Sequence, residues 1–373
     1  MTPRGRRLLG MIRKESLQIL RDPSSISIAF VMPVVLLLLF GYGVSLDARS
    51  IPLGIVIEQP DTTTQSLAGA FERSEFFAPR RYGSIQQAQQ ALAERRIDGV
   101  LWLRNDFSRR ALRGDTAPIG VFVNGVDSNQ ANITRGYIQG TWLAWLQHVA
   151  GARGRPLTLP VALEQRIWFN QAVSSRLFLV PGLIAIIMTM IGSLLTAMVV
   201  AREWERGTME ALLVTPLHMA EMLFGKLVPY FLLGMGGMLL SVAMALLLFD
   251  VPLRSPLWLL AGSSALFMLL SLAIGLLISI VTRNQFLAGQ VALVVSFLPS
   301  FLLSGFLFDI HSMPQWVQTL TYLVPARYFV AMLQTLFLAG PVWPVLLANG
   351  AAMLLMLVVL TVAVVRKSRK RLD

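Results

Sequence analysis

The sequence contains no cysteine and only three histidines, His148, His218 and His311, in 373 residues. The lack of cysteine excludes disulfides, thiolate metal sites and cysteine nucleophiles, and three scattered histidines do not support a histidine metal site. Charged residues are scarce as well, at 14% against about 25% in soluble domains. Several charge-free runs exceed the roughly 18 residues that a membrane-spanning helix needs. The fold class predicted is therefore a polytopic α-helical membrane protein.

Sequence signatures of nucleotide-binding and hydrolytic enzymes are also missing. The only Gly-Lys pair, Gly225-Lys226, is followed by Leu227 and has no upstream glycine-rich loop, so it does not form a phosphate cradle. No G-x-S-x-G, H-E-x-x-H or dinucleotide-binding fingerprint occurs. No catalytic, cofactor-binding or metal-ligating residue is predicted, and the chain is not expected to be an enzyme.

Six apolar runs predict transmembrane helices, and none of them contains a charged residue. A charge at the centre of a spanning helix costs about 2.5–3.5 kcal/mol on the insertion scale. Ion-coupled carriers usually place acids, histidines or broken helices within their spans. Charge-free spans therefore disfavour a secondary carrier, which remains the main alternative among transporters. The six runs are residues 26–45, 177–200, 227–249, 257–281, 286–308 and 345–365.

The distribution of basic residues predicts the orientation of these spans. Residues 1–25 hold six basic side chains and the tail, residues 366–373, holds five, whereas the loops 250–256 and 309–344 hold only Arg254 and Arg327. By the positive-inside rule both termini are expected in the cytoplasm. The net charge of +12 then fits anionic lipid headgroups better than nucleic acid.

Two segments are expected to lie outside the hydrocarbon core. Residues 1–25 alternate basic and apolar side chains, which indicates a cytoplasmic amphipathic helix on the headgroups, although a plain basic tail is an alternative. Residues 46–176 predict an extracytoplasmic (periplasmic) α/β domain between spans 1 and 2, since long domains cross the membrane regardless of charge. Its expected strands are residues 53–57, 97–103 and 119–123, and its expected helices are residues 61–73, 84–96, 106–113 and 129–149.

A dense group of charges occupies the loop at residues 201–226, between the second and third spans. The pattern predicts one short helix over residues 202–214 and another beginning at Thr215-Pro216. Glu203, Glu205 and Glu210 would then lie near the start of the first helix, where its dipole favours anions. Taken alone, the loop also fits a solvated cytoplasmic connector.

The run from Arg202 to Pro216 resembles the loop after the second span of ABC-2 type transporter permeases, R-E-x-E-x-G-T-x-E-x-L-L-x-(T/S)-P. The resemblance implies that this loop docks on a separate ATP-binding subunit, which would hold ATP and magnesium. It also implies two ATPase copies, a second permease copy or paralogue, and in some systems a periplasmic adaptor. The ATPase-coupling residues so implied are Arg202, Glu203, Glu205, Arg206, Gly207, Thr208, Glu210, Leu213 and Pro216.

A re-entrant segment is expected at residues 312–340, because residues 312–324 and 328–340 are apolar but too short to cross. Pro325 to Phe329 would join the two pieces, with Pro325, Arg327 and Tyr328 at the hinge. Arg327 fits a snorkelling interfacial anchor as well as a substrate contact. The candidate translocation path, equally explained by helix kinks and packing, comprises Pro181, Thr189, Ser193, Pro299, Ser300 and Ser304.

These features together predict the membrane subunit of an ABC-2 type exporter, similar to bacterial multidrug-type permeases with a large periplasmic domain. Its substrate would be hydrophobic or amphiphilic, drug-like or lipid-like, and its location the inner membrane. A membrane-anchored receptor or interaction protein is the second alternative. It predicts activity without any ATPase partner.

Overall fold

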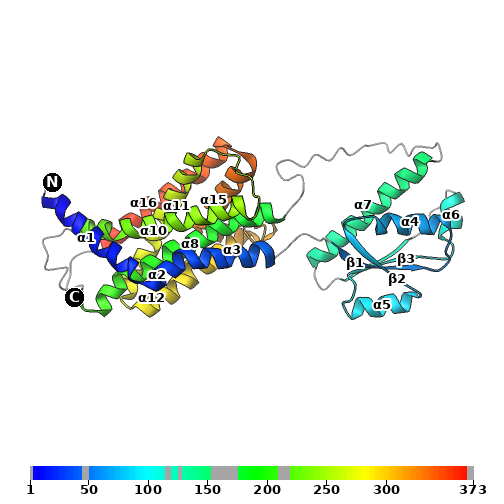
Figure 1. The fold of residues 1–373 in the computed structure, drawn as a ribbon, viewed down its shortest axis with the longest axis horizontal. Helices are drawn as coiled ribbons and strands as arrows, with labels where there is room; N and C mark the ends of the chain where they lie inside the picture. The colour runs from blue at the N-terminus through cyan, green and yellow to red at the C-terminus, as the bar shows by residue number, and fades with distance from the viewer. Residues whose placement is uncertain are drawn as a thin grey trace. The chain divides into compact units, whose positions relative to one another are not determined.

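A computed structural model describes residues 3–43, 50–113, 119–124, 128–152, 175–208 and 219–367 (Figure 1). The chain divides into two compact units. Met1–Ser45 and Ile167–Asp373 form one, called the membrane unit here, and Leu46–Arg166 form the other, called the α/β unit.

Six helices of the described residues are long and apolar enough to cross a membrane. They correspond to the six predicted spans, which confirms a polytopic helical protein. The first and fifth spans each contain a π-helical turn, η1 (Ser27–Val31) and η2 (Leu293–Phe297). The elements are α2 (Pro23–Ile26), η1 and α3 (Met32–Gly43); α8 (Ser175–Glu205); α10 (Met219–Leu247); α11 (Leu257–Thr282); α12 (Gln285–Ala292), η2 and α13 (Leu298–Leu303); and α16 (Trp343–Lys367).

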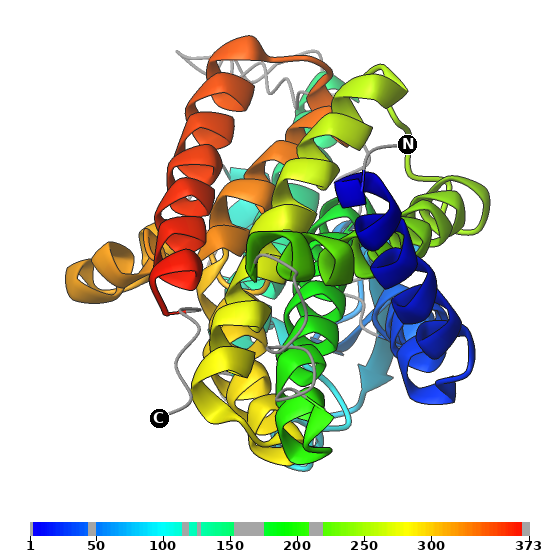
Figure 2. The same cartoon turned by 90° about the vertical axis from the view of Figure 1, so that its left-hand side faces the viewer.

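Helix α8 is the core of the membrane unit. In its most apolar window 89% of the residues are buried, against 11% in α16. It packs against α3, α10, α11, α12 and α15 (Pro325–Gln334). A helix that is apolar all round and buried on all sides is stabilised by packing rather than by contact with lipid. Figure 2 shows the bundle from the end where α1 (Pro3–Leu20) lies.

Helices α8 and α11 approach each other closely at Gly275. A Cβ atom built on Gly275 of α11 would collide with Ser193 O and Thr196 Oγ1 of α8. The Thr196 hydroxyl donates across this contact to Leu272 O at 3.1 Å. Small residues permit such backbone approach between membrane helices.

We therefore expect Gly275→Ala to destabilise the membrane unit by about 1–3 kcal/mol, because one side of the new clash is backbone. Gly262→Ala on the same helix is the matched control, since a Cβ there would meet nothing within 4 Å. The control should be neutral or slightly stabilising. Thermal unfolding of the purified chain measures both, and equal unfolding temperatures would contradict the packing described.

The N-terminal segment forms the helix predicted for it, α1. Met11, Glu15 and Ile19 are buried at a spacing of four residues, whereas Leu9 and Leu20 are exposed. The buried face packs against α10. Met11 also belongs to one apolar cluster with Val200, Met222, Leu276 and Val364, which come from α8, α10, α11 and α16. Its position on the headgroups stays a prediction.

The α/β unit is built on a four-stranded sheet of order β2-β1-β3-β4. Strand β1 is parallel to β2 and β3, and β4 is antiparallel to β3. The core on one face includes Leu67, Phe71, Phe107 and Trp145 from α4, α6 and α7, and α5 contributes Ala88 and Ala91 to a second cluster. The elements are β1 (Ile51–Ile57), α4 (Thr62–Glu72), β2 (Phe77–Tyr82), α5 (Ile85–Ala93), β3 (Gly99–Leu103), α6 (Phe107–Arg113), β4 (Ile119–Val123) and α7 (Ser128–Ala152).

All three predicted strands and four predicted helices of this unit are confirmed to within a few residues at each end. Strand β2 was not predicted. Its sequence contains Pro79 and the charged pair Arg80 and Arg81, which argue against a central strand. Because β2 is an edge strand that pairs only with β1, the missing amide of Pro79 and the charged side chains are tolerated.

The segment expected to be re-entrant contains α14 (Gln315–Thr321) followed by α15 and the π-helical turn η4 (Thr335–Ala339), with a bend of 83°. The predicted pair of short helices is present, but its predicted connection is wrong. Pro325 to Phe329 form the first turns of α15, and residues 322–324 make the connection. Proline suits the first turn of a helix, where its missing amide has no partner to lose.

Candidate functional site

The charged motif begins inside α8, which continues through Glu205 instead of ending before Arg202. The prediction that Glu203 and Glu205 lie near the start of a helix is therefore wrong. They lie at its carboxyl end, where the helix dipole disfavours anions. Arg202 and Glu203 are buried as well. A buried anion in this position needs cations from other parts of the chain.

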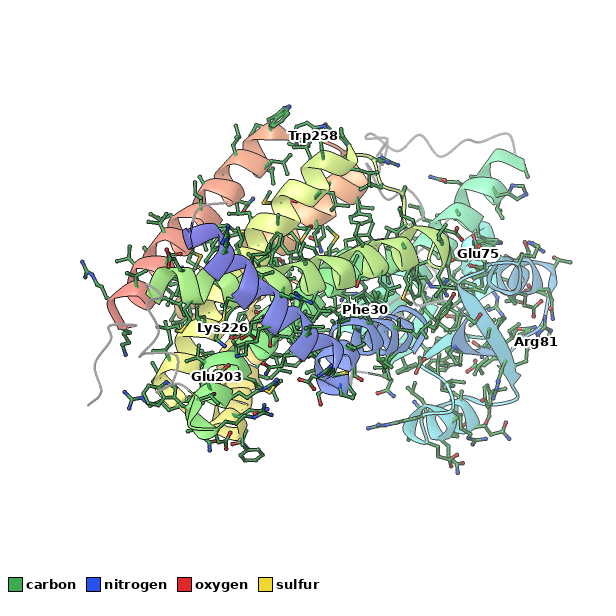
Figure 3. All side chains as sticks on the ribbon, turned by 60° about the vertical axis from the view of Figure 1, so that its left-hand side comes forward. Phe30, Glu75, Arg81, Glu203, Lys226 and Trp258 are labelled. Atoms are coloured by element: carbon green, nitrogen blue, oxygen red, sulfur yellow. The ribbon has the colours of Figure 1, made fainter. Side chains whose placement is uncertain are left out.

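Those cations belong to a charge cluster of Lys14, Glu15, Glu203 and Lys226, in which all but Lys14 are buried. Lys226 Nζ lies 2.7 Å from Glu15 Oε1 and 2.9 Å from Glu203 Oε1. Lys14 Nζ lies 2.7 Å from Glu203 Oε1 and 3.3 Å from Glu15 Oε1. Figure 3 shows Glu203 and Lys226 next to α1. The two positive and two negative charges compensate each other and join three helices, α1, α8 and α10.

Lys14 keeps its charge because its pairing with the two carboxylates outweighs the cost of its partial burial. Burial alone would lower the pKa of Lys14, but its hydrogen bond to Glu203 and the charges of Glu15 and Glu203 raise that pKa above its ordinary value of 10.5. The Thr208 hydroxyl donates a further hydrogen bond to the Glu203 carboxylate. A buried ion-pair network adds little net stability over apolar packing, but it penalises any arrangement that separates its members. The cluster therefore fixes how α1 and α10 sit on the end of α8.

A second ion pair ties α8 to the junction between α1 and α2. Arg202 Nη2 lies 3.1 Å from Asp22 Oδ2. Asp22 also caps α2, since it accepts hydrogen bonds from Ser24 N at 3.1 Å and Ser25 Oγ at 2.9 Å. Burial would raise the pKa of Asp22, but the Ser25 hydroxyl and the Arg202 guanidinium hold that pKa below its ordinary value of 3.8.

Since the pKa of Asp22 is lowered by folding, its charge stabilises the protein at neutral pH, and this contribution is lost as the pH falls through 3.8 towards the folded-state value. We expect Asp22→Asn to lower the stability at pH 7 by about 1.5–3 kcal/mol, because Arg202 loses its charged partner. The difference in stability between variant and wild type should shrink as the pH is lowered below 3.8. Thermal unfolding at pH 7 and at steps below pH 4 measures this. A difference that is constant over the whole range would contradict the role of the ion pair.

The connection between α11 and α12 is also attached to the end of α8. Glu205 accepts hydrogen bonds from the side-chain Nδ2 of Asn284 and from the backbone N–H of Gln285, each at 3.3 Å. The Arg283 guanidinium lies 4.6 Å from the centre of the Trp204 ring. Arg283 itself ends α11 in the left-handed conformation, with φ of 52°. Contacts of residues 202–205 of α8 thus reach α1, the junction between α1 and α2, α10 and the α11–α12 connection.

The predicted coupling residues therefore fall into two groups. Arg202 and Glu203 are buried within the chain, whereas Glu205, Arg206, Gly207 and Thr208 are exposed. Gly207 has φ of 68°, a conformation that suits glycine at a helix end. The other predicted coupling residues, Glu210, Leu213 and Pro216, lie outside the described residues.

Sequence reasoning missed Lys14, Glu15 and Lys226, the partners of Glu203. One local signal was present: Glu15 is the only acid in a basic helix and shares the spacing of Met11 and Ile19, which marks a buried face. Its partner Lys226 is 211 residues away in the chain, and no local pattern connects the two.

The candidate path residues lie in two helical segments. Pro181, Thr189 and Ser193 are buried in α8, and the hydroxyls of Thr189 and Ser193 donate to Ala185 O and Thr189 O of the same helix at 2.9 and 2.7 Å. Pro299 and Ser300 lie in α13. Ser304 follows α13 and accepts a hydrogen bond from the Phe306 amide at 3.3 Å.

The structure brings the two segments together at Phe306. A Cβ atom built on Gly182, which follows Pro181, would lie 2.6 Å from the Phe306 ring. Phe306 is fully buried, so its side chain fills the space at this contact. The role of these residues in a path stays a prediction.

The three predicted hinge residues belong to α15, and two of them, Arg327 and Tyr328, form hydrogen bonds with the end of α14. The Arg327 guanidinium donates to Gln318 O at 3.4 Å and to the Thr321 hydroxyl, and lies 3.8 Å from the centre of the Tyr322 ring. The Tyr328 hydroxyl donates to Tyr322 O at 2.9 Å. A cation that bonds the carbonyl end of α14 stabilises that end. Pro325 begins α15.

Comparison with known proteins adds a family and several relatives. Residues 23–366 match a family model described as ABC-2 family transporter protein. The chain is 42% identical to "Probable multidrug ABC transporter permease YbhS" of Escherichia coli (strain K12), over 99% of this chain and 98% of the relative. It is 28% identical to the permease YbhR of that strain, which bears the same description, over 92% and 95% of the two chains. It is 29% identical to the strain's "Inner membrane transport permease YhhJ", over 81% and 82%.

Proposed function

Because this chain belongs to the ABC-2 family of transporter proteins, we propose that it is the membrane subunit of an ATP-driven exporter that takes its energy from a separate ATPase. It is a multi-pass membrane permease of the multidrug ABC transporter type. The ATPase subunit would bind ATP and magnesium, and this chain would supply the route across the inner membrane. Two ATPase copies and a second permease copy or paralogue complete the proposed assembly.

The observation that carries this proposal is the attachment of the end of α8. One turn of this central helix is joined to α1, α10 and the α11–α12 connection by the charge cluster, the Arg202–Asp22 pair and the contacts of Glu205. A displacement of the exposed residues 206–208 that follow would therefore move several spans together. Packed interfaces respond to such a displacement by switching between arrangements and not by bending gradually.

The remaining parts of the chain have proposed positions in this scheme. Both termini and the end of α8 face the cytoplasm, and the α/β unit, within residues 46–176, faces the periplasm, where it receives or gates the substrate and in some systems meets an adaptor. The bent pair α14–α15 is re-entrant. A hydrophobic or amphiphilic substrate, drug-like or lipid-like, passes along a route that includes Pro181, Thr189, Ser193, Pro299, Ser300 and Ser304.

Purification in a mild detergent tests the assembly. Expression of the tagged chain together with an ABC-type ATPase subunit from the same organism should yield a stable complex of stoichiometric composition. Arg206→Glu, at an exposed position next to the predicted docking segment, should weaken that complex, whereas Arg366→Glu at the end of α16 should not. Recovery of fully active permease without any ATPase would argue for a receptor or another function.

A further inference from the structure

A cavity of about 820 Å³ lies among α1, the end of α8 and the start of α12. Five of its lining residues are basic and only Asp22 is acidic. The glutamines Gln18 and Gln285 add polar groups, and Leu17 adds an apolar wall. The basic residues are Arg13, Lys14, Arg21, Arg202 and Arg206.

Much of this positive charge is not compensated within the chain. Asp22 is paired with Arg202, and Lys14 is paired with Glu203 and Glu15. Arg13, Arg21 and Arg206, by contrast, form no ion pair with any residue that the structure describes. Three unpaired cations around one cavity repel each other and produce a positive potential that attracts an anion.

A second observation points to an anionic oxygen. Arg202 is only 8% exposed, and its Nε–H has no hydrogen-bond acceptor among the described residues. A buried donor without an acceptor is unfavourable, because it has lost its hydrogen bond to water and gained no other. A phosphate oxygen in the cavity would satisfy this donor, and arginine forms strong charge-assisted hydrogen bonds with phosphate.

The surroundings of the cavity favour a lipid as the source of the phosphate. Leu17 lines the cavity and is also exposed, and Leu9 and Leu20 are exposed on the same helix. Gln285, which also lines the cavity, is followed by exposed Phe286. Basic side chains beside exposed apolar ones are the arrangement that an interfacial helix presents to anionic headgroups and acyl chains.

We propose that this cavity binds the phosphate-bearing headgroup of an anionic membrane lipid. The phosphate is held between Arg13 and Arg21 of α1 and Arg202 and Arg206 at the end of α8. A bound headgroup therefore adds a further link between the N-terminal helix and the segment next to the predicted docking loop. The proposal needs no ATPase, so it can fail or hold independently of the proposed export function.

Thermal unfolding of the purified full-length chain, titrated with lipid in mixed micelles, tests the proposal. Phosphatidylglycerol should stabilise the wild type, and phosphatidylcholine should not. Arg13→Gln combined with Arg21→Gln should weaken the apparent affinity about 30-fold, since each basic contact with an anionic surface contributes roughly a fivefold factor. Arg6→Gln combined with Arg366→Gln removes the same charge from exposed positions that do not line the cavity, and should change the affinity less than about threefold.

Several results would overturn the proposal. Equal losses in the two double variants would show diffuse attraction of lipid to a basic protein. Equal stabilisation by phosphatidylcholine would remove the requirement for an anion. Stabilisation by inorganic phosphate that equals the lipid effect would identify a free anion as the ligand. If a bound ATPase subunit displaced the lipid at every lipid concentration tested, the cavity would be a protein contact and not a lipid site. Native mass spectrometry of the same variants checks that the lipid is bound.

Discussion

Lys226→Met is expected to destabilise the membrane unit by about 3–5 kcal/mol, the usual cost of removing one partner from a buried ion pair. The Lys226 side chain is 1% exposed and lies within 3 Å of both Glu15 and Glu203. Methionine has similar length and no charge, so the two carboxylates would be left close together with only Lys14 to compensate them. Unfolding of the purified chain in detergent measures the loss.

Lys14→Met is the matched control, because this side chain forms the same kinds of pair but is 46% exposed. The Lys14→Met variant should lose less than about 1 kcal/mol of stability, as is usual for partly solvated ion pairs. Addition of Glu15→Met to Lys226→Met should recover part of the stability, since it removes one uncompensated anion. If Lys226→Met were as stable as Lys14→Met, the buried cluster would not organise this end of the bundle.

Glu205→Lys is expected to reduce ATP-driven export while leaving the amount of inserted chain unchanged. Glu205 is exposed, so the substitution buries no charge, but it removes the acceptor for Asn284 Nδ2 and the Gln285 amide. The link between α8 and the α11–α12 connection would be lost. Coupling energies between sites of about 1–3 kcal/mol correspond to factors of roughly 5–150. The amount of substrate transported per ATP hydrolysed should therefore decrease by a factor in that range.

Glu205→Gln keeps an acceptor oxygen and should retain most of the transport. Proteoliposomes that contain the complex allow ATP hydrolysis and substrate movement to be measured together. Unchanged transport per ATP in Glu205→Lys would refute a role for this link in coupling. The parallel substitution Glu203→Lys is less informative than the sequence motif suggests, because Glu203 is buried beside Lys14 and Lys226 and a third cation there would disturb folding.

The spans and the N-terminal helix could be predicted from the sequence because their signals are local. A long uninterrupted apolar run in a membrane is helical, and the alternation of basic and apolar side chains predicts the amphipathic helix α1. The edge strand β2 could not be recognised, since Pro79 and its two arginines carry the features of a loop.

The end of α8 could not be predicted for a related reason. A charge is the only local sign that a span has ended, so the prediction stopped before Arg202. The helix continues because Asp22, Lys14 and Lys226 compensate the charges of its last turn, and these partners come from distant parts of the chain. The motif identified the right residues, but it could not tell the buried ones from the exposed ones.

Transport by the purified chain, with and without its ATPase, tests the central claim most directly. The chain alone in liposomes should hydrolyse no ATP and move no substrate against a gradient, whether ATP or an ion gradient is supplied. The complex with the ATPase should move substrate only when ATP is present. Uphill transport by the chain alone, driven by an ion gradient or by its own hydrolysis of ATP, would contradict the account.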